Sequence, residues 1–171
     1  MLVKRYSGIS IINHWVTVLL VAAMLVLGYA AFGAPNEDVE DYIIGIHISL
    51  GFFVFLFIVW RVFFRLYEGF PSPVGNTPFE RKAAYIVHRL LIFLLLLQVF
   101  TGPLYLFTEG EGVNVFGWFT VSIPLEGLSF IHEAMEVMHI ATGLVIIPLV
   151  LVLHISGAIR HYWKQDTPSD L

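Results

Sequence analysis

The chain has 171 residues, of which 58% are hydrophobic and only 13% are charged, and its formal net charge is −4. A soluble domain of this length needs a charged surface, so the composition indicates a protein whose solvent is lipid. The absence of cysteine excludes disulfides, thiolate metal sites, iron–sulfur clusters and covalent c-type haem attachment. Any bound metal or cofactor must be held by nitrogen or oxygen ligands, and seven histidines are available.

Four uncharged apolar runs are long enough to cross a hydrocarbon core of about 30 Å, which takes about 20 helical residues. They cover residues 9–32, 42–60, 90–108 and 137–159. The first run exceeds the roughly 7–15 apolar residues usual for a secretory signal, so we expect a span there rather than a cleaved leader. The pattern predicts an all-α fold, one domain over residues 1–171 that forms an integral membrane four-helix bundle, with spans at about 9–32, 42–65, 84–108 and 130–159.

The charged residues are distributed unevenly between the two ends of these spans. The basic residues precede the first span, surround the loop between the second and third, or follow the fourth: Lys4, Arg5, Arg61, Arg65, Arg81, Lys82, Arg89, Arg160 and Lys164. The loops at the opposite ends are acidic, with Glu37, Asp38, Glu40, Asp41, Glu109, Glu111, Glu126, Glu133 and Glu136. The positive-inside rule therefore predicts that both termini are cytoplasmic. The second outer loop, about 109–129, is predicted to form a cap rich in aromatic residues at the bilayer surface.

Histidine is the only residue type inside the four apolar runs that titrates near neutral pH, and such residues in a membrane are functional candidates. His14 and His154 each lie about five residues from the cytoplasmic end of a span, whereas His47 and His139 lie near outer ends. Each level therefore draws one histidine from each of two helices. Two stacked bis-histidine haems require this arrangement. Hydrogen-bonded packing would explain any one histidine but not the matched depths.

The fourth span carries one candidate ligand at each level. His139 and His154 are fifteen residues apart, which is about 22 Å along an α-helix and about 60° around its axis. Pro148 lies between them and is expected to kink the helix. A glycine follows each outer histidine by four residues, at Gly51 and Gly143. These glycines either leave room for a flat macrocycle or serve helix packing, as small residues commonly do in membranes.

The remaining histidines and several arginines lie near the membrane edges. His132 shares a helix face with His139 but lies about 10 Å further out, so it is predicted to be a surface residue. His161 is predicted to be interfacial. His88 opens the third span at the cytoplasmic edge, where it would contact a haem propionate or a quinone headgroup, or serve as an ordinary interfacial residue. The arginines at this edge are natural propionate partners and also satisfy the positive-inside bias: Arg61, Arg65 and Arg89.

Several short motifs occur together along the chain: Arg5-Tyr6-Ser7 before His14-Trp15, then Ile46-His47-Ile48-Ser49-Leu50-Gly51, Trp60-Arg61 to Phe64-Arg65, His88, and His154 with His161-Tyr162. As a set they resemble the bacterial cytochrome b561 family, and the resemblance covers nearly the whole chain. It implies a four-helix bundle with two non-covalent haems b. Their irons would be ligated by His14 with His154 on the cytoplasmic side, and by His47 with His139 on the periplasmic side. It also implies a bacterial inner-membrane protein.

One feature departs from the family pattern. Family members usually space the two ligands of the fourth span fourteen residues apart, whereas His139 and His154 are fifteen apart. A local bulge or kink associated with Pro148 would absorb one residue. The alternative is that His132 takes the outer position, although its spacing of twenty-two residues to His154 is too great unless the helix is interrupted.

The leading functional hypothesis is an oxidoreductase that relays electrons through two haems between the quinone pool and a periplasmic donor or acceptor. Family members exchange electrons with quinones, and some are linked to superoxide oxidation or to soluble periplasmic proteins. The acidic outer face argues weakly against an anionic donor such as superoxide. The alternatives are a haem-bearing anchor subunit of a larger redox complex, and a histidine-based proton or metal transporter. The expected partners are the lipid bilayer, a quinone, a periplasmic redox or carrier protein and a second copy of the chain, with no nucleic acid.

Overall fold

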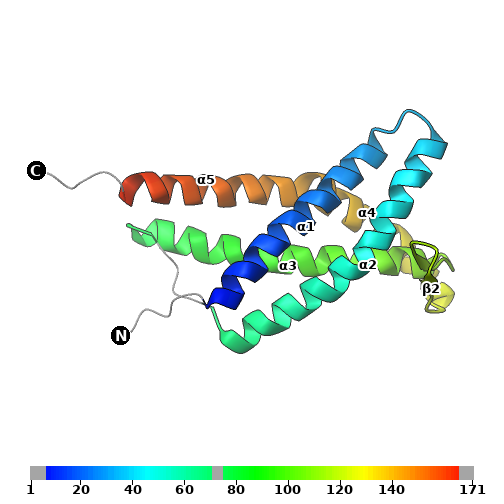
Figure 1. The fold of residues 1–171 in the computed structure, drawn as a ribbon, viewed down its shortest axis with the longest axis horizontal. Coiled ribbons are helices and arrows are strands. Elements are labelled where there is room, and N and C mark those ends of the chain that lie inside the picture. Colours follow the sequence, from blue (N-terminus) through cyan, green and yellow to red (C-terminus); the bar gives the residue numbers. More distant parts are fainter. Residues whose placement is uncertain (1–6, 71–74, 166–171) are drawn as a thin grey trace, which may run out of the picture.

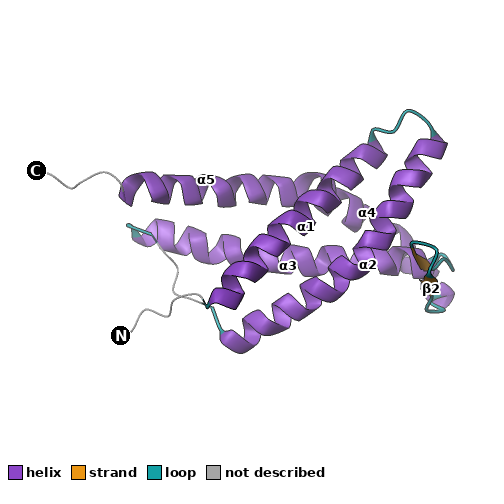
Figure 2. Ribbon diagram, viewed as in Figure 1, coloured by secondary structure: helices purple, strands orange, loops and turns teal. Residues whose placement is uncertain are grey.

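The computed structural model describes residues 7–70 and 75–165 and consists mainly of long helices (Figures 1 and 2). The elements are α1 (Gly8–Phe32), α2 (Glu37–Glu68), α3 (Pro78–Thr108), β1 (Val113–Val115), β2 (Phe119–Val121), the 3₁₀ helix η1 (Glu126–Ile131), α4 (His132–Ala141), the π-helix η2 (Thr142–Ile146) and α5 (Ile147–Gln165). Four segments are long and apolar enough to cross a membrane, Gly8–Phe32, Glu37–Glu68, Pro78–Thr108 and Glu126–Trp163. The four predicted spans are therefore confirmed. The predicted roles of Lys4, Arg5 and Tyr6 lie outside the described residues.

Hydrogen bonds to side chains cap the N-terminal ends of α1, α2 and α3. The hydroxyl of Ser7 accepts from the Ser10 amide, and the Asn36 side chain accepts from the Val39 amide. Thr77 forms a capping box with Glu80, in which each side chain accepts from the other residue's backbone amide. As a result α2 and α3 begin several residues before the predicted spans at 42 and 84. The apolar run detects only the part of a helix that crosses hydrocarbon, whereas the caps extend the helix into its charged flanks.

The four spans are arranged as two antiparallel hairpins (Figure 1). α1 packs mainly on α2, whereas α3 packs on α4 and α5, and α2 with α3 joins the two hairpins. The start of α1, the end of α2, the start of α3 and the end of α5 lie at one end of the molecule. Among the described residues, α1 with α5 and α2 with α4 are not closely packed helix pairs.

The segment between α3 and α4 contains a short β-hairpin that the sequence analysis did not predict. β1 pairs antiparallel with β2, and the turn between the strands has positive φ at Phe116 and Gly117. Val115 is fully buried. The hairpin is fixed to α2 through Ser49, whose hydroxyl donates to the Asn114 carbonyl at 2.9 Å and accepts from the Phe116 amide at 3.0 Å. Strands of three residues are too short for an alternating pattern to reveal them.

The fourth span is interrupted between its two histidines. The Ile147 amide donates to the Thr142 carbonyl, five residues back, which is the π-helical hydrogen bond of η2. Pro148 follows directly, and its missing N–H cannot serve the carbonyl of Leu144. The hydroxyl of Tyr29 in α1 donates to that carbonyl instead. The spacing of fifteen residues between His139 and His154 led us to expect a local bulge, and the π turn beside Pro148 is such a bulge.

Many large apolar side chains of the four spans are exposed. The exposed set includes Leu19, Val26, Leu56, Phe63, Phe93, Leu149, Val152 and Leu153. A soluble chain rarely exposes such contiguous apolar surface, whereas lipid tails cover it at no cost. The exposed belt and the four spans describe a multi-pass membrane protein in contact with the bilayer.

Candidate functional site

Two histidine pairs lie between the hairpins, one at each level. At the inner level the rings of His14 in α1 and His154 in α5 have centroids 6.3 Å apart, with ring planes at 67°. At the outer level the rings of His47 in α2 and His139 in α4 have centroids 6.2 Å apart, with planes at 85°. All four rings are partly buried. Histidines that are remote in sequence are thus brought together at matched separations.

The outer ring of His139 is oriented by the facing surface of α3. Its Nδ1 donates to the backbone carbonyl of Gln98 at 3.1 Å and lies 3.3 Å from the hydroxyl of Thr101. This contact places the proton on Nδ1 and leaves Nε2 as the nitrogen with a free lone pair to accept a hydrogen bond or bind a metal. The side-chain amide of Gln98 donates to this Nε2 at 3.2 Å. Gln98 and Thr101 could not be recognised from the sequence, because their relation to His139 depends on helix packing.

Two glycines that were not predicted adjoin the outer pair. A Cβ added at Gly102 in α3 would lie 2.8 Å from Cε1 of His139, so only glycine admits the ring there. A Cβ at Gly28 in α1 would lie 3.8 Å from Cε1 of His47, an ordinary contact. The glycines identified from the sequence contact other groups. A Cβ at Gly51 would meet Met24 at 3.5 Å, and one at Gly143 would meet the Gln98 amide at 2.9 Å.

His132 lies in a different environment from His139. Its Nδ1 donates to the Tyr105 carbonyl at 3.2 Å and lies 3.4 Å from the Thr108 hydroxyl, and its Nε2 is 3.9 Å from a carboxylate oxygen of Glu109. Its ring packs on that of Tyr105, with centroids 4.9 Å apart. His132 is therefore held at the end of α3. The histidine ring that the described structure places against His47 is that of His139.

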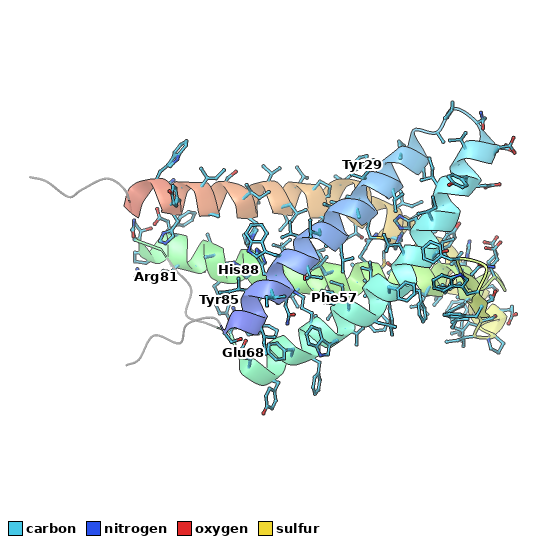
Figure 3. The ribbon with its side chains drawn as sticks, in the orientation of Figure 1. Tyr29, Phe57, Glu68, Arg81, Tyr85 and His88 are labelled. Carbon is cyan, nitrogen blue, oxygen red and sulfur yellow. The ribbon has the colours of Figure 1, made fainter. Side chains whose placement is uncertain are left out.

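His88 lies next to the inner pair. Its ring centroid is 5.0 Å from that of His154, and its Nδ1 donates to the Ala84 carbonyl at 2.6 Å. The neighbouring Arg89 places its guanidinium 3.4 Å from the centroid of the Tyr85 ring and 4.4 Å from that of Phe70. His88 and Tyr85 lie on the same stretch of α3 in Figure 3. A third histidine, His88, therefore lies beside the inner pair.

The arginines near the inner pair differ in their contacts. Arg65 donates to the Ser10 hydroxyl at 2.9 Å and lies 3.4 Å from a carboxylate oxygen of Glu68, which also accepts from Ser10. These hydrogen bonds join the start of α1 to the end of α2, where Figure 3 shows Glu68. Both Arg61 and Arg65 lie within electrostatic range of the His14 ring. The inner level is therefore the positively charged one.

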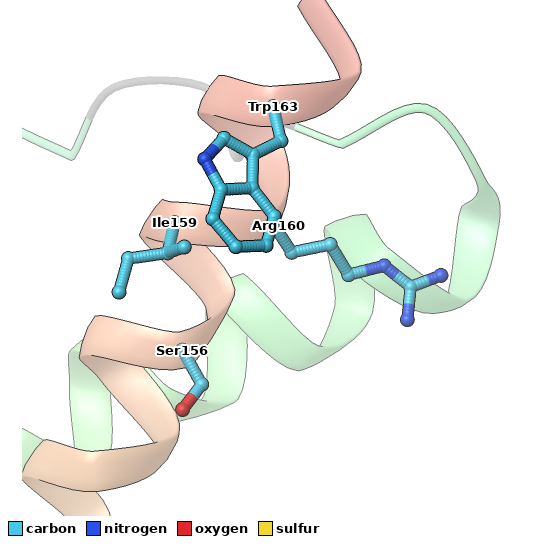
Figure 4. A pocket seen from close by; sticks show the side chains of 4 residues that line it. All are labelled: Ser156, Ile159, Arg160 and Trp163. Carbon is cyan, nitrogen blue, oxygen red and sulfur yellow. The ribbon is translucent and has the colours of Figure 1, made fainter.

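A separate hollow lies on the surface of α5 (Figure 4). It is lined by Ser156, Ile159, Arg160 and Trp163, all from this one helix. Arg160 reaches past it to Glu80 of α3, with an Nη2–Oε1 distance of 3.1 Å. The hollow is therefore distinct from the space between the histidine pairs.

The geometry of both pairs fits a metal ion held between two imidazoles. A transition metal–imidazole bond is about 2 Å, and the ring nitrogen lies about 1 Å from the ring centroid, so two rings across one ion have centroids about 6 Å apart. The observed separations are 6.2 and 6.3 Å. The helices that carry each pair, α1 with α5 and α2 with α4, are not closely packed on each other in the described residues. The buried Nδ1 of His47 has no hydrogen-bond partner among the described residues, unlike a histidine retained for packing.

Comparison with known proteins identifies the family to which the chain belongs. A family model described as prokaryotic cytochrome b561 matches residues 5–169. Cytochrome b561 homolog 2 of Escherichia coli (strain K12) is 28% identical over 168 residues, which cover 96% of this chain and 89% of that relative. The family match includes all four spans and both histidine pairs. The chain belongs to the prokaryotic cytochrome b561 family, whose members transfer electrons across membranes with haem b.

Proposed function

We propose that the chain binds two b-type haems and relays single electrons through them between the quinone pool and a periplasmic donor or acceptor in the bacterial inner membrane. Family membership implies haem b and transmembrane electron transfer. The observation that carries the number of haems is the repetition of one histidine geometry at two levels, with centroids 6.3 and 6.2 Å apart. His14 with His154 holds the inner haem, and His47 with His139 holds the outer haem.

The protein's own groups prepare these sites for electron transfer. When bound, each haem supplies an iron that gains or loses one electron. The Gln98 carbonyl and Thr101 hydroxyl hold Nδ1 of His139, so Nε2 would be the nitrogen that binds the haem iron, in place of the hydrogen bond that it accepts from the Gln98 amide. The low dielectric of the spans and the arginines at the inner level tune the affinity of each site for an electron. We assign the inner level to the cytoplasmic side because the basic residues lie there.

The direct test is a haem count on the purified chain after haem-replete expression. A pyridine haemochrome assay and a reduced-minus-oxidised visible spectrum should give two haems b per chain, and a quinol analogue should reduce them. A colourless protein would contradict the proposal and favour the histidine-based transporter. Haem that is reduced only in the presence of a copurifying dehydrogenase would favour the anchor subunit.

Gly102→Ala should disturb the outer haem. The new Cβ would lie 2.8 Å from Cε1 of His139, a separation that real Cβ atoms do not show, so the ring must turn away from its position. We expect about half of the bound haem to be lost or to show an altered low-spin spectrum, measured as haem per chain. Gly157→Ala is the matched control, because a Cβ there meets nothing within 4 Å. Equal spectra for the two variants would refute the importance of the Gly102 contact.

Arg61→Gln should lower the midpoint potential of the inner haem. A nearby positive charge favours the reduced iron, which carries one positive charge less, and Arg61 lies within electrostatic range of the inner ligand His14. Removing the charge should lower the potential by about 20–60 mV in a potentiometric titration. Arg81→Gln is the control, since Arg81 donates to the Gly75 carbonyl at the start of α3. An unchanged potential would remove Arg61 from the predicted propionate partners.

A further inference from the structure

Tyr29 is a polar residue that the proposed electron transfer does not use. It lies in α1 (Figure 3), and its hydroxyl donates to the backbone carbonyl of Leu144 in η2. In an α-helix this carbonyl would accept from the amide of residue 148, four residues on. Residue 148 is proline, which has no N–H. The tyrosine hydroxyl therefore replaces a backbone donor that the sequence has removed.

The segment that receives this hydrogen bond controls the geometry of the fourth span. In η2 the Ile147 amide donates to the Thr142 carbonyl, so this turn contains one residue more than an α-helical turn. His139 precedes the π turn and His154 follows it. Absorbing one residue changes the relative direction of the two rings by about 100°. The π turn thus decides whether His139 can face α2 while His154 faces α1.

The surroundings of Tyr29 support a role at this position. Thr142, at the start of the π turn, is buried, and its hydroxyl donates to the Met138 carbonyl. Gly28, next to Tyr29 in α1, lies against the ring of His47. The Tyr29 hydroxyl therefore lies at the level of the outer pair. It contacts η2, the segment that orients His139.

We propose that Tyr29 is a positioning residue: its hydroxyl donates to the Leu144 carbonyl, whose α-helical donor Pro148 removes, and so holds the π turn and sets the relative direction of His139 and His154. The consequence for haem rests on the proposed function. The stabilisation of the π turn itself does not, because the hydrogen bond belongs to the chain alone.

The test combines Tyr29→Phe, Pro148→Ala and the double variant, with Tyr42→Phe as the control at an exposed tyrosine of α2. Hydrogen–deuterium exchange of the amides between residues 142 and 150 is measured by mass spectrometry on the full chain in detergent, together with haem per chain. Tyr29→Phe should raise exchange in this segment about five-fold, the factor that corresponds to losing one ordinary hydrogen bond. Tyr42→Phe should leave it unchanged.

The double variant separates this role from general helix packing. Pro148→Ala supplies the missing backbone N–H, so adding Tyr29→Phe in that background should give no further increase in exchange. Tyr29→Phe alone should also change the low-spin haem spectrum or reduce haem per chain. Equal exchange in Tyr29→Phe and Tyr42→Phe, or the same five-fold increase in the Pro148→Ala background, would overturn the proposal. A wild type without haem that still shows this dependence would refute the proposed function and uphold the role of Tyr29 in the helix.

Discussion

His139→Ala should remove about half of the haem from the purified chain, whereas His132→Ala should leave the haem content unchanged. The His139 ring centroid lies 6.2 Å from that of His47, and its Nδ1 donates to the Gln98 carbonyl, so Nε2 would bind the metal once the Gln98 amide gives way. His132 instead has its Nδ1 at the Tyr105 carbonyl and its Nε2 near Glu109. Without the His139 imidazole, only His47 would hold the outer haem, and we expect that haem to be lost during purification.

The measurement is a pyridine haemochrome assay normalised to protein, with the low-spin spectrum recorded on the same samples. His132→Ala is a matched control because it removes an imidazole from the same helix, α4. The loss of haem in His132→Ala with retention in His139→Ala would move the outer site to His132. It would also require a large change in α4, since η2 alone absorbs only one residue.

His154→Ala should remove the inner haem, and His88→Ala should retain both haems. His154 is the ring that the structure places 6.3 Å from His14, the separation expected across one metal ion. His88 lies closer to His154, at 5.0 Å, and its Nδ1 donates to the Ala84 carbonyl. We therefore expect His88 to tune the inner site rather than ligate it. About half of the haem should be lost in His154→Ala, and electron entry from quinol should fall with it.

The same haem count distinguishes His154 from His88 as the inner ligand. A redox titration of His88→Ala then tests whether His88 changes the midpoint potential of the inner haem. If His154→Ala kept both haems while His88→Ala lost one, the inner ligand would be His88. If both variants lost the inner haem, the pairing of His14 with His154 alone would be insufficient to explain the site.

The number of spans and the common depth of His14 and His154 could be predicted because both follow from position along a helix, whereas the sequence left the outer partner of His47 open between His139 and His132. The length of an uncharged apolar run such as 90–108 corresponds to the thickness of the hydrocarbon core of the bilayer. Depth along a span likewise follows from residue number, so His14 could be matched with His154 without knowledge of which helices pack together. The structure agrees in bringing these two rings to one level.

The groups that orient the ligands could not be predicted, because they depend on contacts between helices. Gly102 and Gln98 are unremarkable in a run of apolar residues until α3 is packed against His139. Two roles were open for Gly51 and Gly143, and their contacts with Met24 and Gln98 on neighbouring helices agree with helix packing. Helix packing in a membrane depends on shape rather than on hydrophobicity, so the sequence pattern carries little information about it.

The division into two hairpins has a consequence for how the protein is assembled. His14 and His47 belong to the first hairpin, and His139 and His154 belong to the second. Each proposed haem would therefore join one half of the molecule to the other. Lipid supplies no hydrophobic force to hold two inserted hairpins together. The two hairpins could then insert into the membrane independently. Haem binding would afterwards link them, because each haem takes one histidine from each hairpin.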